Sequence, residues 1–159
     1  MAAPPASAVL RAYRLLRLLP GGRRAFSTAY AWQAPYFRSI RPRVLRLGPH
    51  HAEVLVPDRR AVHNHLGGVH AIAVCNGLEA AMGALATVTV PRTHRWVPKG
   101  MNVDYLARAD SDIRCIAETT AADWAGGPDV PVSVHAVRAD GTVVVRGVIR
   151  LWVTERSAD

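Results

Sequence analysis

The stretch that decides the fold reads Asn64-His65-Leu66-Gly67-Gly68-Val69-His70 and continues as Ala71-Ile72-Ala73-Val74-Cys75-Asn76-Gly77-Leu78-Glu79-Ala80-Ala81-Met82-Gly83. A polar, glycine-bearing loop leads into a helix, predicted over 69–85, that is apolar on nearly every side. Because a surface helix keeps a polar face, we expect this helix inside the fold. Glu79 is an ionisable group among apolar neighbours, and such a group seldom lacks a partner or a chemical purpose. The first helical N–H groups have no intrahelical acceptor and carry partial positive charge, so the stretch offers a carboxylate and an oxyanion hole.

The rest of the chain alternates apolar and polar residues in a way that predicts strands. These cover residues 44–47, 52–56, 95–107, 113–119, 130–136 and 143–153. Pro98-Lys99-Gly100 interrupts the third strand and predicts a bulge or bend, and Asp140-Gly141 predicts a hairpin turn. One long apolar helix with about six antiparallel strands predicts an α+β fold, in which a curved sheet wraps around the buried helix.

The net charge of +8 is confined to the N-terminal third of the chain. Residues 1–52 hold nine arginines and no acid, whereas residues 53–159 hold eleven Lys or Arg against twelve Asp or Glu. Apolar residues at helical spacing predict an amphipathic helix over 9–19, and a second short helix is expected over 25–32. A basic segment attracts phosphate groups, as in nucleic acid, anionic lipid or the nucleotide end of coenzyme A. We interpret it first as a solvated helix face.

Cys75 and Cys115 have no C-x-x-C spacing, and we interpret both as reduced, buried residues in a reducing compartment. A cytoplasmic location is therefore expected. The Arg-rich, acid-free start also resembles a mitochondrial transit peptide, which leaves a mitochondrial location as the alternative. Residues 69–91 are long enough to span a membrane. Glu79, and the strands that follow directly, argue against that assignment.

The central stretch resembles the motif of hotdog-fold acyl-CoA thioesterases of the phenylacetate-pathway and four-hydroxybenzoyl-CoA type. Their pattern is an Asn, a short loop, His-Gly-Gly, and an Asp or Glu further along the central helix. Asn64 matches the Asn, His70 the His and Glu79 the acid, while Ala71 and Ile72 stand in place of the two glycines. The resemblance extends to the strand Met101-Asn102-Val103-Asp104-Tyr105 and covers about residues 43–154. Ala34-Pro35-Tyr36-Phe37 and Arg95-Trp96-Val97-Pro98-Lys99-Gly100-Met101 resemble an uncharacterised bacterial branch of the superfamily.

The resemblance implies a hotdog domain over 43–154, with a helical extension over 1–42 and a tail over 155–159. It implies a homodimer or a homotetramer, since hotdog subunits usually join their sheets. It also implies hydrolysis of a fatty or aromatic acyl-CoA to the free acid and coenzyme A, without a metal or redox cofactor. A non-catalytic acyl-CoA-binding protein is the alternative, because Ala71 and Ile72 narrow the mouth of the site. A third class is a protein whose basic N-terminus binds a membrane or nucleic acid. We expect no nucleic-acid partner, and leave membrane contact open.

The resemblance also assigns roles to individual residues. Glu79 would act as general base toward water or as nucleophile, and the N–H of Ala71 would polarise the thioester carbonyl. Asn64 would orient the water or donate to the acyl group, and His70 would fix the loop or the thioester pocket. The residues expected to contact the substrate or coenzyme A are Gly68, Ile72, Lys99 and Arg108.

Each role has a structural alternative. Glu79 could pair with an arginine at a subunit interface, Asn64 could be a turn residue, and Lys99 and Arg108 could be solvated strand ends. No metal site is predicted, because the histidines fit no ligand spacing. These are His50, His51, His63, His65 and His70.

The spacing along the helix bears on how the site is assembled. Ala71 and Glu79 are eight residues apart on one helix, about 12 Å at 1.5 Å per residue. A thioester carbonyl needs its N–H donor and the attacking oxygen each within about 3 Å. One helix scarcely supplies both groups. We therefore expect a two-fold related copy of the helix to bring Glu79 of one subunit beside Ala71 of the other.

Overall fold

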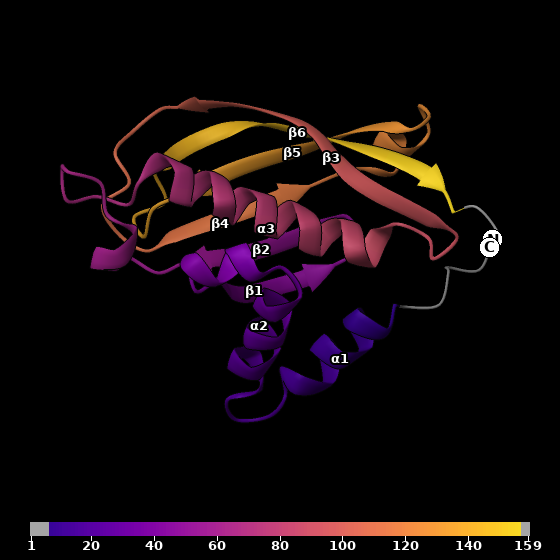
Figure 1. Ribbon diagram of the computed structural model, residues 1–159, viewed down its shortest axis with the longest axis horizontal. Helices are drawn as coiled ribbons and strands as arrows, with labels where there is room; N and C mark the ends of the chain where they lie inside the picture. The colour runs from indigo at the N-terminus through magenta and orange to yellow at the C-terminus, as the bar shows by residue number, and fades with distance from the viewer. Residues whose placement is uncertain (1–6, 157–159) are drawn as a thin grey trace.

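The computed structural model describes residues 7–156 and shows one curved sheet with a long helix lying along one of its faces (Figure 1). The six strands pair antiparallel in the order β1-β2-β4-β5-β6-β3. Their bounds are β1 (Arg43–Gly48), β2 (His51–Val56), β3 (His94–Tyr105), β4 (Ile113–Glu118), β5 (Asp129–Val137) and β6 (Val143–Glu155). The helices are α1 (Ala8–Leu16), α2 (Gly22–Gln33) and α3 (Ala71–Thr89), with short 3-10 turns η1 (Pro35–Ser39), η2 (Arg60–Val62) and η3 (Ala121–Trp124). The predicted α+β architecture is confirmed.

The central helix α3 begins two residues later and ends four residues later than the sequence pattern predicts. Val69 still belongs to the loop, because its N–H donates to the carbonyl oxygen of Ala109 at 2.7 Å. At the other end the helix continues to Thr89, and Val90 is extended. A residue that precedes a proline is disfavoured in the helical conformation. Pro91 therefore sets the end of α3, rather than any loss of apolar residues.

Both predicted irregularities of the sheet are present. The register of β3 against β6 shifts between Pro98 and Gly100, which is the predicted bulge. The turn between β5 and β6 closes with a hydrogen bond of 2.9 Å from the Arg138 N–H to the Thr142 carbonyl oxygen. Gly141 in this turn has a φ of 87°, a conformation that glycine adopts without a Cβ clash.

The core lies between α3 and the concave face of the sheet. Its largest fully buried side chains include Leu78, Met82 and Leu85 of α3 and Ile113, Ile149 and Leu151 of the sheet. All of them belong to one contiguous cluster of buried residues. By length and composition α3 could cross a membrane, with a mean hydropathy of 1.5, but 67% of its apolar stretch is buried inside the fold. This burial agrees with its interpretation as a core helix.

The two N-terminal helices pack into the same core, below the β1 edge in Figure 1. The side chains that they contribute to the core cluster of buried residues are Leu10 and Tyr13 of α1 and Phe26 of α2. The N–H of Val44, at the start of β1, donates to the Ser27 hydroxyl at 2.9 Å. The Tyr30 hydroxyl donates to the carbonyl oxygen of Ala80 in α3 at 2.6 Å. The predicted helices are confirmed, and their apolar faces are part of the core.

Gly77 lets α3 approach two central strands. A Cβ at this position would lie 2.4 Å from Cγ2 of Val56 in β2 and 2.6 Å from Sγ of Cys115 in β4. We expect Gly77→Ala to lower the free energy of unfolding by about 1–3 kcal/mol, because overpacking displaces the helix from both strands. This loss should outweigh the better helix propensity of alanine. Urea denaturation followed by circular dichroism measures the change.

Gly126→Ala is the control for that experiment. No atom lies within 4 Å of a Cβ built at Gly126, so its unfolding midpoint should equal or exceed that of the unmodified protein. A Gly77→Ala protein as stable as the unmodified one would contradict the close approach of helix and sheet.

Candidate active site

The loop that precedes α3 is organised by the Asn64 side chain. Its Oδ1 accepts hydrogen bonds from the N–H of Leu66 at 2.9 Å and from the N–H of Gly68 at 3.3 Å. The backbone closes the same loop, because the Asn64 N–H donates to the Gly68 carbonyl oxygen at 2.8 Å. Asn64 thus has the turn role that the sequence left open as an alternative. Its Nδ2 forms no hydrogen bond within residues 7–156, so this donor remains available to a ligand.

The loop is held against the segment that follows β3. A Cβ at Gly68 would lie 2.6 Å from the carbonyl oxygen of Ala109, so only glycine allows this approach. Arg108 lies beside the loop and its guanidinium donates to the Leu66 carbonyl oxygen. Two residues predicted to bind substrate, Gly68 and Arg108, are therefore brought together as the framework of the loop. Their contact with a substrate stays a prediction.

The first turn of α3 carries an unused backbone donor. His70 is the N-cap residue, and its Nδ1 accepts from the N–H of Ile72 at 3.1 Å. A neutral imidazole that accepts at Nδ1 holds its proton on Nε2. The Ala71 N–H has no acceptor among the described residues 7–156. This free N–H at the positive end of the helix is a ready donor for a carbonyl oxygen.

A hollow of about 230 Å³ opens at this end of the helix. Its lining, which defines the helix-start hollow, is Tyr36, Ser39, Ile40, Ala61, Val62, His63, His70, Ile72, Ala73 and Asn76. Asn76 is buried, and its Nδ2 donates to the Ser39 hydroxyl at 3.2 Å. Its Oδ1 is also buried and has no partner within the described part of the chain. Sequence reasoning assigned no site role to Asn76, although a lone amide in an apolar helix was the available signal.

Glu79 lines a different hollow, of about 300 Å³, on the same helix. Its lining, which defines the Glu79 hollow, is Tyr30, Gln33, Ala34, Phe37, Glu79, Met82, Gly83, Thr87 and Trp96. Glu79 is half-buried and has no hydrogen bond or ion pair with any residue in 7–156, so no arginine of its own chain neutralises it. Burial, and then the Glu79 charge, raise the pKa of the Tyr30 phenol well above its usual range. The two hollows share no residue, so one chain does not bring Glu79 to the start of α3.

Lys99 is directed to the opposite face of the sheet. Its Nζ lies 2.9 Å from Oδ2 of Asp129 and 4.4 Å from the centre of the Trp152 ring. Trp152 follows the buried Leu151, and successive strand residues point to opposite faces. Lys99 therefore lies on the face turned away from α3. Its predicted contact with coenzyme A is not supported by this position and stays a prediction.

The His63 side chain and the two cysteines are not arranged as a metal site within residues 7–156. His63 pairs with Asp58, and within residues 7–156 no group of three or more His, Cys, Asp or Glu could hold a metal ion. Both cysteines are free thiols, one in α3 and one in β4 as expected. Burial raises the pKa of the Cys115 thiol. Cys75 is half-buried, and its Sγ lies 3.3 Å from the Tyr105 hydroxyl.

The curved antiparallel sheet, its enclosed helix and the loop at the helix start define a protein of the hotdog fold. The chain belongs to the family described as Domain of unknown function (DUF4442), whose model matches residues 22–153. The crystal structure of the genomics protein APC5556 is similar, with 38% identity and a TM-score of 0.81 over 94% of this chain and 100% of that one. No curated protein matches the chain.

Two further solved structures share the fold at lower identity. A Pseudomonas aeruginosa protein, PA5026, described as a probable thioesterase, is 19% identical with a TM-score of 0.73, over 87% of this chain and 97% of that one. A thioesterase family protein from Silicibacter pomeroyi is 20% identical with a TM-score of 0.69, over 82% of this chain and 96% of that one. The resemblance inferred from the sequence, to the hotdog thioesterase superfamily, is confirmed at the level of the fold.

Asn64→Ala should loosen the loop before α3. The change leaves the amides of Leu66 and Gly68 without their acceptor, and a hydrogen bond is worth about 1 kcal/mol net. We expect these two amides to exchange with deuterium about fivefold faster, measured by NMR. Asn64→Asp is the matched variant because it keeps the Oδ1 acceptor, and it should retain the protection. Equal exchange in all three proteins would show that Oδ1 does not order the loop.

Proposed function

We propose that this protein is a thioesterase that hydrolyses an acyl-CoA to a free acid and coenzyme A. The observation that carries the proposal is the Ala71 N–H at the start of α3, which has no acceptor within residues 7–156. Ala71 lies between His70 and Ile72, and both of these residues line the helix-start hollow. Such a donor stabilises the negative charge that develops on a carbonyl oxygen when water attacks it. The thioesterase descriptions of two proteins with the same fold support this choice of reaction.

In the proposed reaction the thioester carbonyl occupies the helix-start hollow, and its oxygen accepts a hydrogen bond from the Ala71 N–H. The Glu79 carboxylate takes a proton from water while the water oxygen attacks the carbonyl carbon. The tetrahedral intermediate then collapses, and the carbon–sulfur bond breaks with its electron pair on sulfur. The departing sulfur receives the proton that Glu79 took, which releases coenzyme A. The atoms and electrons balance without an oxidant, a reductant or a metal.

We further propose that each site is shared between two subunits. Ala71 and Glu79 are about 12 Å apart along α3, and the hollow that Glu79 lines is separate from the helix-start hollow within one chain. β3 is the last strand of the sheet order, and an unpaired edge is a template for pairing with another chain. Exposed apolar side chains lie on β3, on the loops near it and at the start of α3: Leu66, Ile72, Val97, Met101, Tyr105 and Leu106. A two-fold axis along this surface would form a dimer with two equivalent sites.

Ile72 favours a second candidate function. Its side chain lines the helix-start hollow and is 55% exposed, where the related motif has a glycine. A side chain at the mouth could admit a thioester for binding and block the approach of water. The second candidate is therefore a non-catalytic acyl-CoA-binding protein.

A thiol-release assay separates the two candidates. Short, long and aromatic acyl-CoAs are incubated with the protein, and free thiol is measured with a chromogenic disulfide. Turnover of any of them supports the thioesterase. Binding of acyl-CoA by calorimetry, with no thiol released from the whole panel, would instead establish the binding protein.

Glu79→Gln should abolish turnover and preserve the fold. The amide has nearly the same shape but cannot accept a proton as a base, so we expect kcat to fall by about 10²-fold or more. Glu155→Gln is the matched control, since Glu155 is exposed at the end of β6 and belongs to neither hollow. Circular dichroism checks the folding of both variants. A Glu79→Gln protein with full activity removes the carboxylate from the mechanism, and one that unfolds assigns Glu79 a structural role.

Two inactive variants should restore activity when they are mixed. Ala71→Pro removes the N–H at the first position of α3, where proline is well tolerated, and His70 before it is already extended. A heterodimer of Ala71→Pro and Glu79→Gln chains holds one site with both defects and one site with neither. Random exchange yields half heterodimers, so the mixture should regain about a quarter of the unmodified activity. No recovery after proven subunit exchange, or a fully active monomer by light scattering, would refute the shared site.

A further inference from the structure

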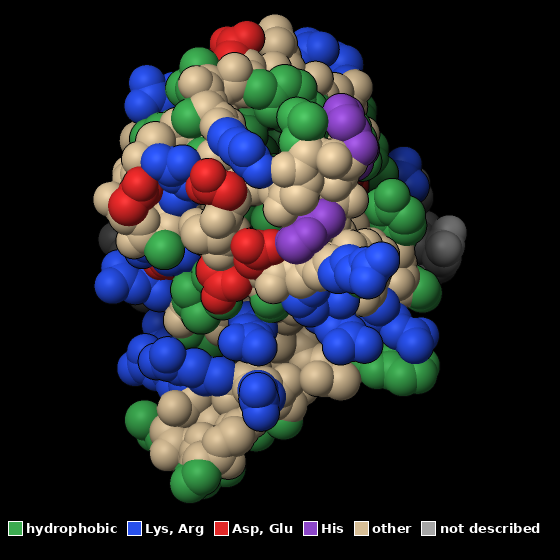
Figure 2. Space-filling model, turned by 90° about the vertical axis from the view of Figure 1, so that its left-hand side faces the viewer, with side chains coloured by type: hydrophobic (Ala, Val, Ile, Leu, Met, Phe, Trp, Pro, Cys, Tyr) green, Lys and Arg blue, Asp and Glu red, His purple; other side chains and the backbone are tan. Residues whose placement is uncertain are grey.

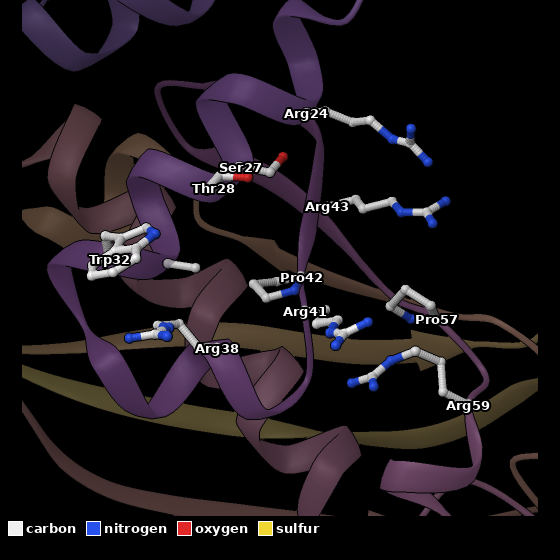
Figure 3. A pocket seen from close by; sticks show the side chains of 11 residues that line it. Arg24, Ser27, Thr28, Trp32, Arg38, Arg41, Pro42, Arg43, Pro57 and Arg59 are labelled. Carbon is white, nitrogen blue, oxygen red and sulfur yellow. The ribbon is translucent and has the colours of Figure 1, made fainter.

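A third hollow, with a volume of about 510 Å³, is formed mainly by the N-terminal extension (Figure 3). Its walls are α2, the connection from η1 to β1, and the segment that follows β2. The lining is Arg24, Ser27, Thr28, Ala31, Trp32, Arg38, Arg41, Pro42, Arg43, Pro57 and Arg59. We call it the arginine pocket, because five of these eleven residues are arginines and none is acidic.

Within residues 7–156 the five guanidinium groups have no acidic counter-charge. None of them lies within 4.0 Å of a carboxylate among residues 7–156, although other arginines of the chain form such pairs. In Figure 3 the groups of Arg41 and Arg59 approach one another, while Arg24 and Arg43 extend in the same direction. Figure 2 shows the end of the molecule at the left of Figure 1, where Lys and Arg side chains form a band with the Asp and Glu side chains above it. Like charges gathered in this way are stabilised by a bound anion.

Arg59 and Arg41 each have a further feature that is typical of a binding site. The Nε of Arg59 is buried and has no partner in the described residues, while its Nη2 donates to the Ser39 carbonyl oxygen at 2.9 Å. Burial and the nearby Arg41 charge lower the pKa of Arg59. Arg41 itself has a φ of 46°, in the left-handed region that side chains rarely adopt. Backbone strain of this kind concentrates at ligand sites.

An aromatic ring faces the same hollow. Trp32 lines the pocket, and 60% of its surface is exposed. The guanidinium of Arg38 lies 4.2 Å from the centre of its ring. The Arg38 guanidinium covers one face of this indole, and the exposed remainder of the ring is a stacking surface for a nucleobase. The pocket therefore offers groups both for phosphates and for a flat ring.

The arginine pocket adjoins the helix-start hollow. Arg38 and Arg41 line the first, and Ser39 and Ile40, which lie between them in sequence, line the second. A second stretch of chain also joins the two hollows, because Arg59 lines the arginine pocket and residues 61–63 line the helix-start hollow. Consecutive Cα atoms are 3.8 Å apart, so residues 59 and 62 are separated by at most about 11 Å. One extended ligand could occupy both hollows.

We propose that the arginine pocket binds the phosphorylated nucleotide end of the substrate, with its phosphates on the arginines and its base on Trp32. The identity of the thioester rests on the proposed function, whereas the anion site stands on the pocket itself. A single ring beside one hollow of limited size fits one nucleotide better than a nucleic-acid strand or a membrane surface, which would need an extended basic face. The substrate is then a nucleotide-bearing thioester, and the N-terminal extension selects it.

Calorimetry with the full chain tests the pocket without any thioester. Adenosine 3′,5′-bisphosphate should bind, and adenosine and inorganic pyrophosphate should each bind more weakly, because each supplies only one of the two contacts. Arg24→Gln/Arg43→Gln should weaken the bisphosphate by at least about tenfold, since both side chains are exposed and without carboxylate partners in 7–156. Trp32→Ala should weaken it by about tenfold through loss of stacking.

Arg11→Gln/Arg14→Gln is the matched control. It removes the same two charges from the same basic segment, at exposed positions of α1 that do not line the pocket. Its affinity for the bisphosphate should stay within about twofold of the unmodified protein. An equal loss of bisphosphate affinity in both double variants would show that binding depends only on net charge, and it would overturn the proposal. Binding of phosphatidylglycerol vesicles or of single-stranded RNA, without binding of the bisphosphate, would also overturn it.

Kinetics separate this proposal from the proposed function. The unmodified protein should have a lower KM for an acyl-CoA than for the same acyl-pantetheine, which lacks the nucleotide. Arg24→Gln/Arg43→Gln should lose this preference. Equal KM values for the two substrates in the unmodified enzyme would refute the pocket and leave the thioesterase standing. Tight binding of the bisphosphate without hydrolysis of any thioester would refute the thioesterase and support the pocket.

Discussion

The contact between α3 and the sheet at Gly77 is the constraint on which the rest of the structure depends. Because this residue has no side chain, β2 and β4 contact the helix through Val56 and Cys115. The contact fixes the rotation of α3 about its own axis. With Gly77 and Leu78 turned to β2 and β4, Ile72, Cys75 and Glu79 occupy the side of the helix that these central strands do not cover. A single glycine therefore determines which residues of an almost wholly apolar helix stay accessible.

The uncovered side of α3 explains why the chemical groups occur where they do. A carboxylate is costly to bury without a partner, and Glu79 is only half-buried, in a hollow walled by the N-terminal extension. The free N–H of Ala71 lies two turns away on the same helix. The sheet edge at β3 reaches this region, since the Tyr105 hydroxyl contacts the Cys75 thiol. Both groups thus lie near an edge strand, and the proposed pairing of two subunits at that edge would bring them together.

The fold was largely predictable from the sequence, because its strongest signals are local. Apolar periodicity located α3 and all six strands, and the bulge at Pro98 and the turn at Gly141 follow from residue chemistry. The start of α3 was misplaced because Val69 satisfies the same apolar pattern while its backbone bonds to Ala109, forty residues away. Long-range partners of this kind leave no periodic signal.

The site was predictable only in part, for the same reason. The motif identified the loop and the helix start, and left the duties of Asn64 open. Lys99 was expected to contact coenzyme A from its position beside the third strand, and that contact stays a prediction; in the fold its side chain pairs with Asp129. The arginine pocket shows the limit most clearly. Its arginines come from α2, η1, β1 and the segments that flank β1 and β2. The sequence therefore showed an excess of positive charge, but it did not show that the fold brings these arginines together around one hollow.

The structure shows how the N-terminal extension is connected to the hotdog core. A segment unrelated to the fold would leave the core intact when it is removed. Here the extension buries Leu10 at 1% exposure, and Tyr30 bonds directly to α3. It also supplies walls of the Glu79 hollow and of the arginine pocket. Removal of α1 and α2 would therefore uncover apolar core and dismantle both hollows at once. The two helices therefore close the core, and α2 also contributes Arg24 to the arginine pocket.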